Sequence, residues 1–255
     1  MDVQADIREI FSHLRALLRS YQELGLDPPR LSGHVFDGPA TREARATLAG
    51  EAGSEERKGS SPRGDRAALL RDLRRRIGDC QGCKLCKNRN RLVFGEGSPE
   101  ARLVFVGEGP GHEEDRAGRP FVGESGKLLT RIIENGMGLT RQDVYICNVV
   151  KCHPPGNRDP EPDEIAACLP FLKEQLRIIR PEVICTLGRV AVQALLGKQF
   201  RITAERGQWR TYQGIPLMPT FHPAYLLHHV SAKREVWEDV KEIMRRLGLE
   251  VKTRG

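Results

Sequence analysis

Short apolar runs alternate with amphipathic stretches from about residue 100 onward. The runs 103–106, 144–150, 183–186 and 215–219 consist mostly of Val, Ile and Leu, which is typical of buried strands. The stretches 126–135, 162–179, 189–196 and 233–247 have the apolar spacing of helices, and a basic helix is expected over 67–77. Strands and helices in turn predict right-handed βαβ crossovers. The expected fold is therefore α/β: a three-layer α/β/α sandwich with a short, mainly parallel central sheet.

The first 64 residues follow a different pattern. Apolar residues alternate spacings of four and three from Val3 to Leu24, which is the seam of an amphipathic helix that ends at Gly25. Residues 37–63 are rich in Gly, Ser, Ala, Glu and Arg, as flexible linkers are. We predict an N-terminal helix over 1–26, a linker over 27–64, one main domain over 65–249 and a tail over 250–255. The helix favours a protein partner or self-association, with docking on its own domain as the alternative.

Charge and hydropathy narrow the function classes. The chain has 41 Lys and Arg against 34 Asp and Glu, a net charge of +7. The surplus lies after residue 64 and favours a polyanionic partner, although basic side chains also coat ordinary exposed helices. No apolar run approaches the roughly 18 to 20 residues that span a membrane, and the first residues lack the pattern of a signal peptide. We therefore expect a cytoplasmic protein without a membrane contact.

Seven cysteines favour metal binding or buried thiols over a disulfide framework. Cys80 and Cys83 are spaced to present two thiolates to one metal centre, and Cys152 and Cys168 are candidate distant partners. Cys86 repeats the spacing and could replace either member of the first pair. Four thiolates do not by themselves distinguish zinc from an iron-sulfur cluster. The remaining cysteines, which we expect to be buried strand residues, are Cys147 and Cys185.

A glycine-rich loop follows the strand at 103–106. The segment 107–111 lacks the third glycine of a dinucleotide-binding loop, and 123–127 lacks the residues of a phosphate-binding P-loop. The alternative is a tight pocket walled by backbone, with Glu108 at its mouth and Phe121 able to stack on a flat ring. Asn148 lies near the end of an otherwise apolar strand and offers both a donor and an acceptor. This combination favours a nucleobase as the ligand, and an ordinary core aromatic and a capping amide are the structural alternatives.

His222 ends the last predicted strand and precedes Pro223. An imidazole at this position could stabilise negative charge on a leaving group, or it could be an ordinary loop histidine. The residues that follow combine apolar and basic side chains. Such a segment is typical of a loop that inserts into a base stack and holds phosphates, and the residues concerned are Leu226, Leu227, His228, His229, Lys233 and Arg234.

Taken together, these motifs resemble the family-four uracil-DNA glycosylases, the iron-sulfur branch of the uracil-DNA glycosylase superfamily. The resemblance extends from about residue 65 to 249. It rests on six ordered motifs that are jointly specific: Cys80-x-x-Cys83, Gly107-Glu108-Gly109-Pro110-Gly111, Gly118-Arg119-Pro120-Phe121-Val122-Gly123, Asn148-Val149-Val150-Lys151-Cys152, Cys168-x-Pro170-Phe171-Leu172 and His222-Pro223-Ala224-Tyr225-Leu226-Leu227.

The resemblance implies roles for particular residues. A 4Fe-4S cluster would be held by Cys80, Cys83, Cys152 and Cys168, with Cys86 outside the ligand set. The catalytic residues would be Glu108 and His222. Uracil would be bound by Gly107, Glu108, Gly109, Phe121, Asn148 and His222. The DNA contacts and the wedge would be Tyr225, Leu226 and Arg158.

The activity implied is excision of uracil from DNA. The enzyme would flip deoxyuridine out of the helix and hydrolyse its N-glycosidic bond, leaving an abasic site for base excision repair. Its partner would be uracil-containing DNA, which would bring the protein to the nucleoid, and its main domain would be monomeric. Residues 198–208 contain no histidine, which favours turnover over the covalent capture of one superfamily branch. The alternatives are a non-catalytic nucleic-acid-binding module whose metal is held by four cysteines and a glycosylase for a different damaged base.

Overall fold

The computed structural model describes residues 63–251. The predicted N-terminal helix, almost all of the predicted linker and most of the predicted tail lie outside the described residues. Within 63–251, no helix has the length and apolar character needed to cross a membrane.

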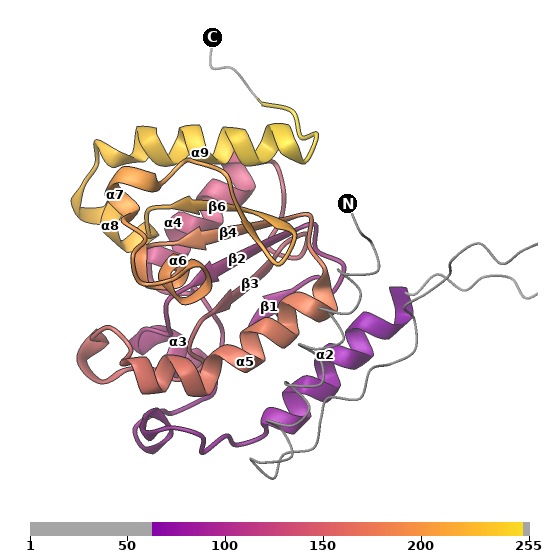
Figure 1. Cartoon of the computed structure of the whole chain (residues 1–255), viewed down its shortest axis with the longest axis vertical. Coiled ribbons are helices and arrows are strands. Elements are labelled where there is room, and N and C mark those ends of the chain that lie inside the picture. Colours follow the sequence, from indigo (N-terminus) through magenta and orange to yellow (C-terminus); the bar gives the residue numbers. More distant parts are fainter. Residues whose placement is uncertain (1–62, 252–255) are drawn as a thin grey trace, which may run out of the picture. The chain divides into compact units, whose positions relative to one another are not determined.

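A six-stranded sheet forms the middle layer of this part of the chain, in the order β1-β3-β2-β4-β6-β5 (Figure 1). The four central strands are parallel, and the two edge strands run antiparallel to their neighbours. The α/β class and the parallel core are confirmed, whereas both edge strands are absent from the predicted elements. The bounds are Glu96–Gly97 (β1), Leu103–Gly107 (β2), Tyr145–Asn148 (β3), Val183–Leu187 (β4), Arg210–Tyr212 (β5) and Ile215–Thr220 (β6).

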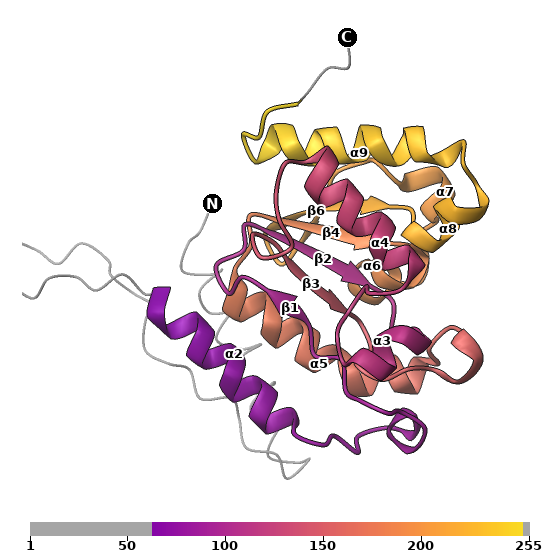
Figure 2. The ribbon, with the colours of Figure 1, turned by 180° about the vertical axis from the view of Figure 1, so that it is seen from behind.

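Helices cover both faces of the sheet (Figures 1 and 2). Residues Val104 and Val106 of β2 point to one face, where α2, α5 and α6 pack. Leu103 and Phe105 point to the other, which α4 and α9 cover. The long helices are α2 (Arg63–Ile77), α4 (Glu124–Arg131), α5 (Pro162–Ile179), α6 (Arg189–Leu196) and α9 (Ala232–Arg246), and the short ones are α3 (His112–Ala117), α7 (Ile202–Glu205), α8 (Pro223–His228), η1 (Lys84–Lys87), η2 (Ile132–Gly136) and η3 (Pro155–Asn157).

Several boundaries differ from the predicted ones, and three of the differences are informative. The basic helix begins at Arg63, four residues before the expected start. The helix expected over 126–135 ends at Arg131 and continues as one turn of π-helix, η2. The strand expected over 144–150 ends at Asn148, although Val149 and Val150 are fully buried. Apolar character alone therefore placed the end of β3 too late, because a buried loop continues the apolar run.

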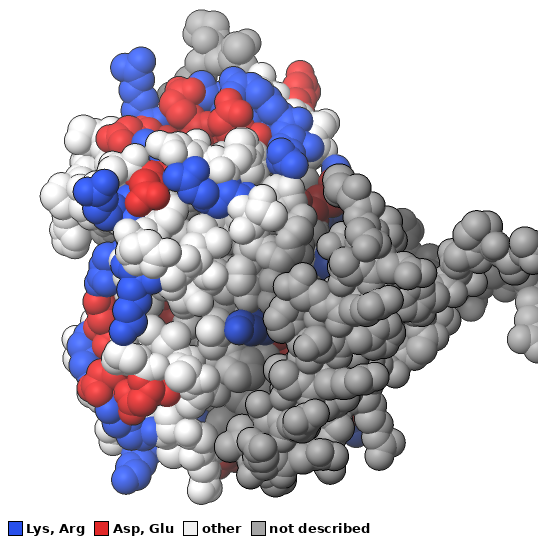
Figure 3. All heavy atoms as spheres, viewed as in Figure 1, with Lys and Arg blue, Asp and Glu red and all other residues white. Residues whose placement is uncertain are grey.

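Surface charge is mixed on the face seen in Figure 3. Basic and acidic side chains lie next to one another along α9 and along the left-hand rim in this view. Two ion pairs join residues of α9 that are three positions apart, Lys241 with Glu238 and Arg245 with Glu242. The positive net charge therefore does not form one continuous patch on this face.

Candidate active site

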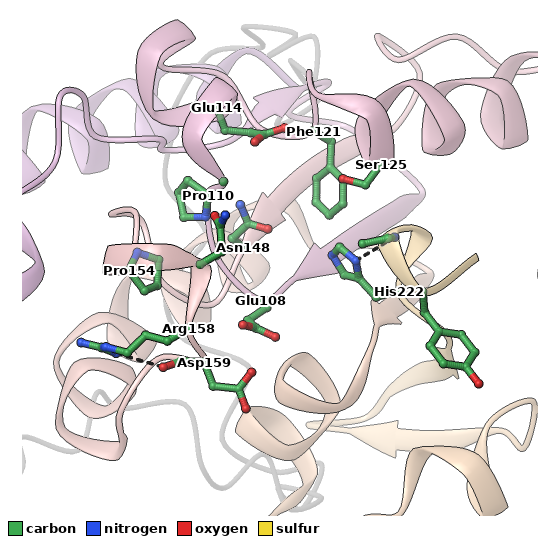
Figure 4. A pocket seen from close by; sticks show the side chains of 15 residues that line it. Glu108, Pro110, Glu114, Phe121, Ser125, Asn148, Pro154, Arg158, Asp159 and His222 are labelled. Carbon is green, nitrogen blue, oxygen red and sulfur yellow. Dashed lines mark hydrogen bonds between the residues drawn. The ribbon is translucent and has the colours of Figure 1, made fainter. Parts of the chain in front are cut away.

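One large pocket opens where β2, β3 and β6 end at the carboxyl edge of the sheet. Its volume is about 510 Å³, which is large enough for a nucleobase and part of its sugar. Loops after these strands bring together residues that are more than 100 positions apart in the sequence. Figure 4 shows Phe121 and His222 pointing into the pocket, with Asn148 and Glu108 on the wall between them and the loop at Pro154. All the residues predicted to bind uracil lie at this edge.

Gly107 permits the close packing of the pocket wall. A Cβ atom on this residue would overlap Asn148 Oδ1 and would lie 2.5 Å from Phe121 Cζ. Gly107 pairs with Asn148 in the parallel ladder of β2 and β3, so the last residue of β2 lies beside the last residue of β3. The absence of a side chain at this position therefore allows the aromatic ring and the amide to meet at the strand ends.

Asn148 carries an unpaired acceptor in the pocket wall. The residue is 1% exposed, and its Oδ1 has no hydrogen-bond partner within the described part of the chain. A buried amide oxygen without a partner is unfavourable. Asn148 also lines the pocket, so a ligand that enters with an N–H group can supply the missing donor.

The loop that carries Phe121 is fixed from two sides. Arg141 donates to the carbonyl oxygens of Pro120 (2.8 Å) and Phe121 (3.1 Å) and pairs with Glu96 (2.6 Å). On the other side, Glu114 accepts from the amides of residues 122 and 123 at 2.8 and 2.9 Å. Phe121 itself has a φ of 52°, a conformation that is unfavourable for a side chain of this size. These contacts hold a strained backbone that presents the ring to the pocket.

His222 is held as a neutral hydrogen-bond donor. Its Nδ1 accepts from the amide of Ala224 at 3.1 Å, at the start of α8. An accepting Nδ1 carries no proton, so the proton of the neutral ring is on Nε2. Burial lowers the pKa of His222 to about 4, against a small opposing effect of the Glu114 charge. The ring centroid lies 5.6 Å from that of Phe121, so both rings border the same space.

Glu108 lies in the pocket beside an ion pair. Burial, followed by the nearby Asp159 carboxylate, raises the pKa of Glu108 to about 7, while Arg189 acts in the opposite direction. Asp159 and Arg189 pair with each other, and Asp159 also lines the pocket. Glu108 is therefore a carboxyl group able to accept or release a proton near neutral pH.

The predicted DNA contacts occupy three different environments. Tyr225 is 40% exposed at the pocket rim and stacks on His229, with 4.0 Å between ring centroids. Leu226 is 1% exposed and belongs to the core beneath α9, so the prediction that it inserts into DNA is wrong. Its neighbour Leu227, which the sequence also indicated, is 39% exposed. The helical turn of α8 decides which leucine faces outward.

Arg158 lies at the pocket rim, where its guanidinium is engaged. It donates to both carboxylate oxygens of the buried Glu164, at 2.7 and 2.8 Å. The Glu164 carboxylate also holds the pKa of Arg158 above its usual range. In this structure Arg158 therefore anchors the 154–158 loop to the start of α5.

The cysteines form a second candidate site under the same loop. Cys80, Cys83, Cys86, Cys152 and Cys168 line one hollow. Three N–H groups point at sulfur atoms: Gly82 N to Cys80 (3.4 Å), Lys151 N to Cys168 (3.2 Å) and Arg89 Nη1 to Cys152 (3.1 Å). Such donors suit sulfur ligands that carry negative charge. No three His, Cys, Asp or Glu side chains within 63–251 are arranged to hold a single metal ion.

Sequence reasoning did not identify several residues of the pocket wall. Glu114, whose carboxylate accepts from the amides of the Phe121 loop, has no predicted role. Asp159 lies in the Pro-rich loop, where an acidic residue next to an arginine gives no distinguishing signal. Other pocket residues without a predicted role include Ser125, Pro154 and Asn157.

Comparisons with known proteins identify the family of the chain. The model of the uracil DNA glycosylase superfamily matches residues 94–241. The type-4 uracil-DNA glycosylase of Thermotoga maritima is 48% identical over 183 residues, covering 69% of this chain and 94% of the relative. That of Sulfurisphaera tokodaii is 46% identical over 182 residues, covering 68% and 83%. A type-5 uracil-DNA glycosylase of Pyrobaculum aerophilum is 31% identical over 166 residues, covering 59% and 72%.

Proposed function

The chain belongs to the type-4 branch of the uracil-DNA glycosylase superfamily, and we propose that its pocket holds a uracil base flipped out of DNA while the N-glycosidic bond is hydrolysed. The observation that carries the proposal is the unpaired Oδ1 of buried Asn148, in a pocket that Phe121 and His222 also border. The products are free uracil and an abasic site, the starting point of base excision repair.

Asn148 provides the base selectivity in this proposal. Its free Oδ1 accepts from N3–H of uracil, and its amide nitrogen donates to O4. Cytosine presents the reverse pattern, an acceptor at N3 and a donor at C4, so it leaves the buried Oδ1 without a partner. A site built around a specific hydrogen bond rejects the wrong base more strongly than an apolar site does. The ring of Phe121 supports the flat face of the base.

His222 acts on the leaving group. When the N-glycosidic bond breaks, negative charge develops on uracil, and the Nε2–H of a neutral imidazole can donate to its O2 oxygen. Because Nδ1 is occupied by the amide of Ala224, the ring is oriented and its tautomer is fixed before uracil enters. Stabilisation of the departing anion leaves a sugar cation that water can capture.

Glu108 is positioned to orient that water molecule. Its carboxylate form can orient a water molecule and accept a proton from it, with a pKa of about 7 that suits transfer near neutral pH. The raised pKa arises from burial and from Asp159, so the same neighbours that form the pocket rim tune this group. We assign to Glu108 the orientation of water rather than any bond to the base.

The cysteine hollow is proposed to hold a 4Fe-4S cluster through Cys80, Cys83, Cys152 and Cys168. The donor set is all sulfur, and N–H groups already point at three of these residues, which suits thiolate ligands of iron. A bound cluster would fix the loop between Cys152 and Arg158 next to the pocket. Purified protein should be brown, with absorbance near about 400 nm; a colourless, zinc-loaded and active protein would contradict the assignment.

Tyr225 and Leu227 are the proposed contacts with the DNA stack. Both side chains are exposed on α8 next to the pocket, where an apolar group can fill the space that a flipped nucleotide leaves. We place the wedge at Leu227, since Leu226 is buried.

The test uses a labelled oligonucleotide with one deoxyuridine, followed by alkaline cleavage of abasic sites. We expect cleavage only at uracil and loss of cleavage in Asn148→Leu, which has a similar size but neither hydrogen-bonding group. Oligonucleotides with cytosine or thymine at the same position serve as controls. Intact uracil-containing DNA, from protein shown to contain iron, would instead favour a binding module or a different base as substrate.

A further inference from the structure

Lys151 is a buried lysine between the two sites. It is 1% exposed and is one of the largest fully buried side chains of the described region. Lysine is rarely buried without a partner, because its amine loses hydration. Within residues 63–251, the hydrogen bonds of its Nζ go to neutral amide oxygens rather than to a carboxylate. Its burial therefore calls for a different explanation.

The side chain of Lys151 bonds to the backbone of Asn148, the residue proposed to recognise uracil. Its Nζ donates to the backbone carbonyl oxygen of Asn148 at 2.7 Å and to Oε1 of Gln175 at 2.6 Å. Both donations are available to an amine with or without its third proton. Gln175 is itself buried and donates to the carbonyl oxygen of Phe94 (2.9 Å) and to the hydroxyl oxygen of Tyr145 (3.0 Å). A continuous buried network thus connects the end of β3 to α5.

The backbone of Lys151 contacts the cysteine hollow. Its amide donates to Cys168 Sγ at 3.2 Å, its carbonyl accepts from the amide of Val93 at 2.8 Å, and Cys152 follows it directly in sequence. Residues 148 to 152 are therefore one short segment with the base-reading amide at one end and a candidate ligand at the other. Lys151 is the residue in this segment that contacts both sites.

We propose that Lys151 is a positioning residue that holds the Asn148 amide in place for uracil and couples its position to the cysteine hollow. This inference rests on the proposed function of Asn148. The side-chain bond from Lys151 restrains the carbonyl group of Asn148, the last residue of β3, in addition to the backbone pairing of this strand with β2. Burying the amine is unfavourable by itself. In return, Asn148 Oδ1 has a fixed position from which it can accept from N3–H of the base.

Binding of free uracil tests the proposal without relying on turnover. Equilibrium dialysis with radiolabelled uracil compares the wild type with Lys151→Met, which keeps the length of the side chain but no donor. We expect uracil to bind roughly tenfold to a hundredfold more weakly. Lys173→Met is the matched control, because Lys173 is exposed on the neighbouring helix α5, and it should bind as the wild type does.

Iron content and melting temperature, measured on the same preparations, separate positioning from folding. A merely structural role would lower the melting temperature but leave the uracil affinity of the folded, iron-loaded protein unchanged. Gln175→Leu removes the second partner of Lys151 without touching the residues of the cysteine hollow. If Lys151→Met fails to fold, the uracil affinity of Gln175→Leu becomes the test. We expect this variant to bind uracil more weakly to a similar extent. Unchanged uracil affinity in either folded variant would overturn the proposal.

The wild type distinguishes this inference from the proposed function. If the wild type neither binds uracil nor cleaves uracil-containing DNA, the proposed function fails. If it does both and the folded variants match it, only the role of Lys151 fails. The double variant Lys151→Met/Gln175→Leu should bind uracil no more weakly than Lys151→Met, because both changes break one network.

Discussion

At the scale of single residues, burial sets the chemical state of the pocket. The same loss of water keeps His222 neutral and brings the pKa of Glu108 close to neutral pH, because removing water disfavours the charged form of either group. Asn148 has no charge, so burial leaves it an unsatisfied acceptor instead. These three states suit three different roles: His222 can donate to an anion, Glu108 can orient water, and Asn148 can recognise a base.

Replacing His222 with alanine should slow excision of uracil by about 10² to 10³-fold, the range for the loss of one donor to a developing anion. The physical reason predicts a second result: 5-fluorouracil is a better leaving group, so its excision should decline less. Single-turnover rates on the two oligonucleotides measure both. An equal loss on both bases would contradict a role for His222 in stabilising the leaving group.

The pH dependence of kcat/KM should show one acidic limb near pH 7, where the carboxylate of Glu108 becomes protonated. His222 should add no limb above about pH 4. The limb should disappear in Glu108→Gln, whose residual rate should not vary between pH 6 and 8. A limb that persists unchanged in this variant would assign the titration to another group.

The same pKa shift has a consequence for stability. The folded state raises the pKa of Glu108 from 4.5 to about 7 and so favours its protonated form. The stabilising contribution is therefore fully present below about pH 4.5 and is lost as the pH rises through about 7. Denaturant unfolding at pH 5 and pH 8 should show the wild type losing more stability than Glu108→Gln, by about 1 kcal/mol after allowance for partial exposure.

At the scale of elements, the pocket depends on loops that side chains of other elements hold. The Phe121 loop has no regular structure of its own, and its carbonyl and amide groups are paired with Arg141 on one side and Glu114 on the other. Arg141 also pairs with Glu96 of β1, so the edge strand supports the loop. The antiparallel edge strand thus contributes to the site although it lies outside the parallel core.

Arg141→Met should therefore release the Phe121 loop. We expect a loss of about 2 to 4 kcal/mol in the free energy of unfolding, because a partly buried charge network loses its centre, together with an increase in KM for uracil-containing DNA. Arg131→Met on the exposed side of α4 is the control and should change neither quantity by much. If Arg141→Met lowers the free energy of unfolding but leaves KM unchanged, the Arg141 contacts stabilise the fold without shaping the pocket.

At the scale of the whole molecule, the described residues belong to one compact unit. Described residues build two apolar clusters, one on each face of the sheet. Helix α2 begins at Arg63 and packs on α5, so it is part of this unit rather than of the segment before it. The predicted boundary at residue 65 would cut the first turn of this helix.

Deletion of residues 1–62 should leave kcat/KM for uracil excision within about twofold of the full chain, since the proposed uracil-binding residues and the match to the family model at 94–241 all follow residue 62. A truncation that starts two turns later, inside α2, should instead lower the melting temperature, because Leu70 is buried in the core. Excision and thermal unfolding of the two truncated proteins give the comparison. Loss of excision on deletion of 1–62 would contradict the modular view.

Much of the fold could be predicted because its signals are local. The runs at 103–106 and 183–186 are apolar and short, and each becomes a central parallel strand with nearly the predicted bounds. The edge strands could not be predicted, because β1 has two residues and β5 is mostly polar. The end of β3 was missed because the buried residues Val149 and Val150 continue the apolar run after the strand has ended.

The sequence by itself determined the α/β class, the position of polar residues at strand ends and the family motifs, since these depend on periodicity and on residue type. Only the tertiary structure decided that Leu226 faces the core and Leu227 the solvent, that Arg158 is held by Glu164, and that Lys151 lies between the two sites. Those facts depend on which atoms meet across distant segments. A pattern along the chain specifies which residues are apolar or charged, whereas packing specifies what each of them touches.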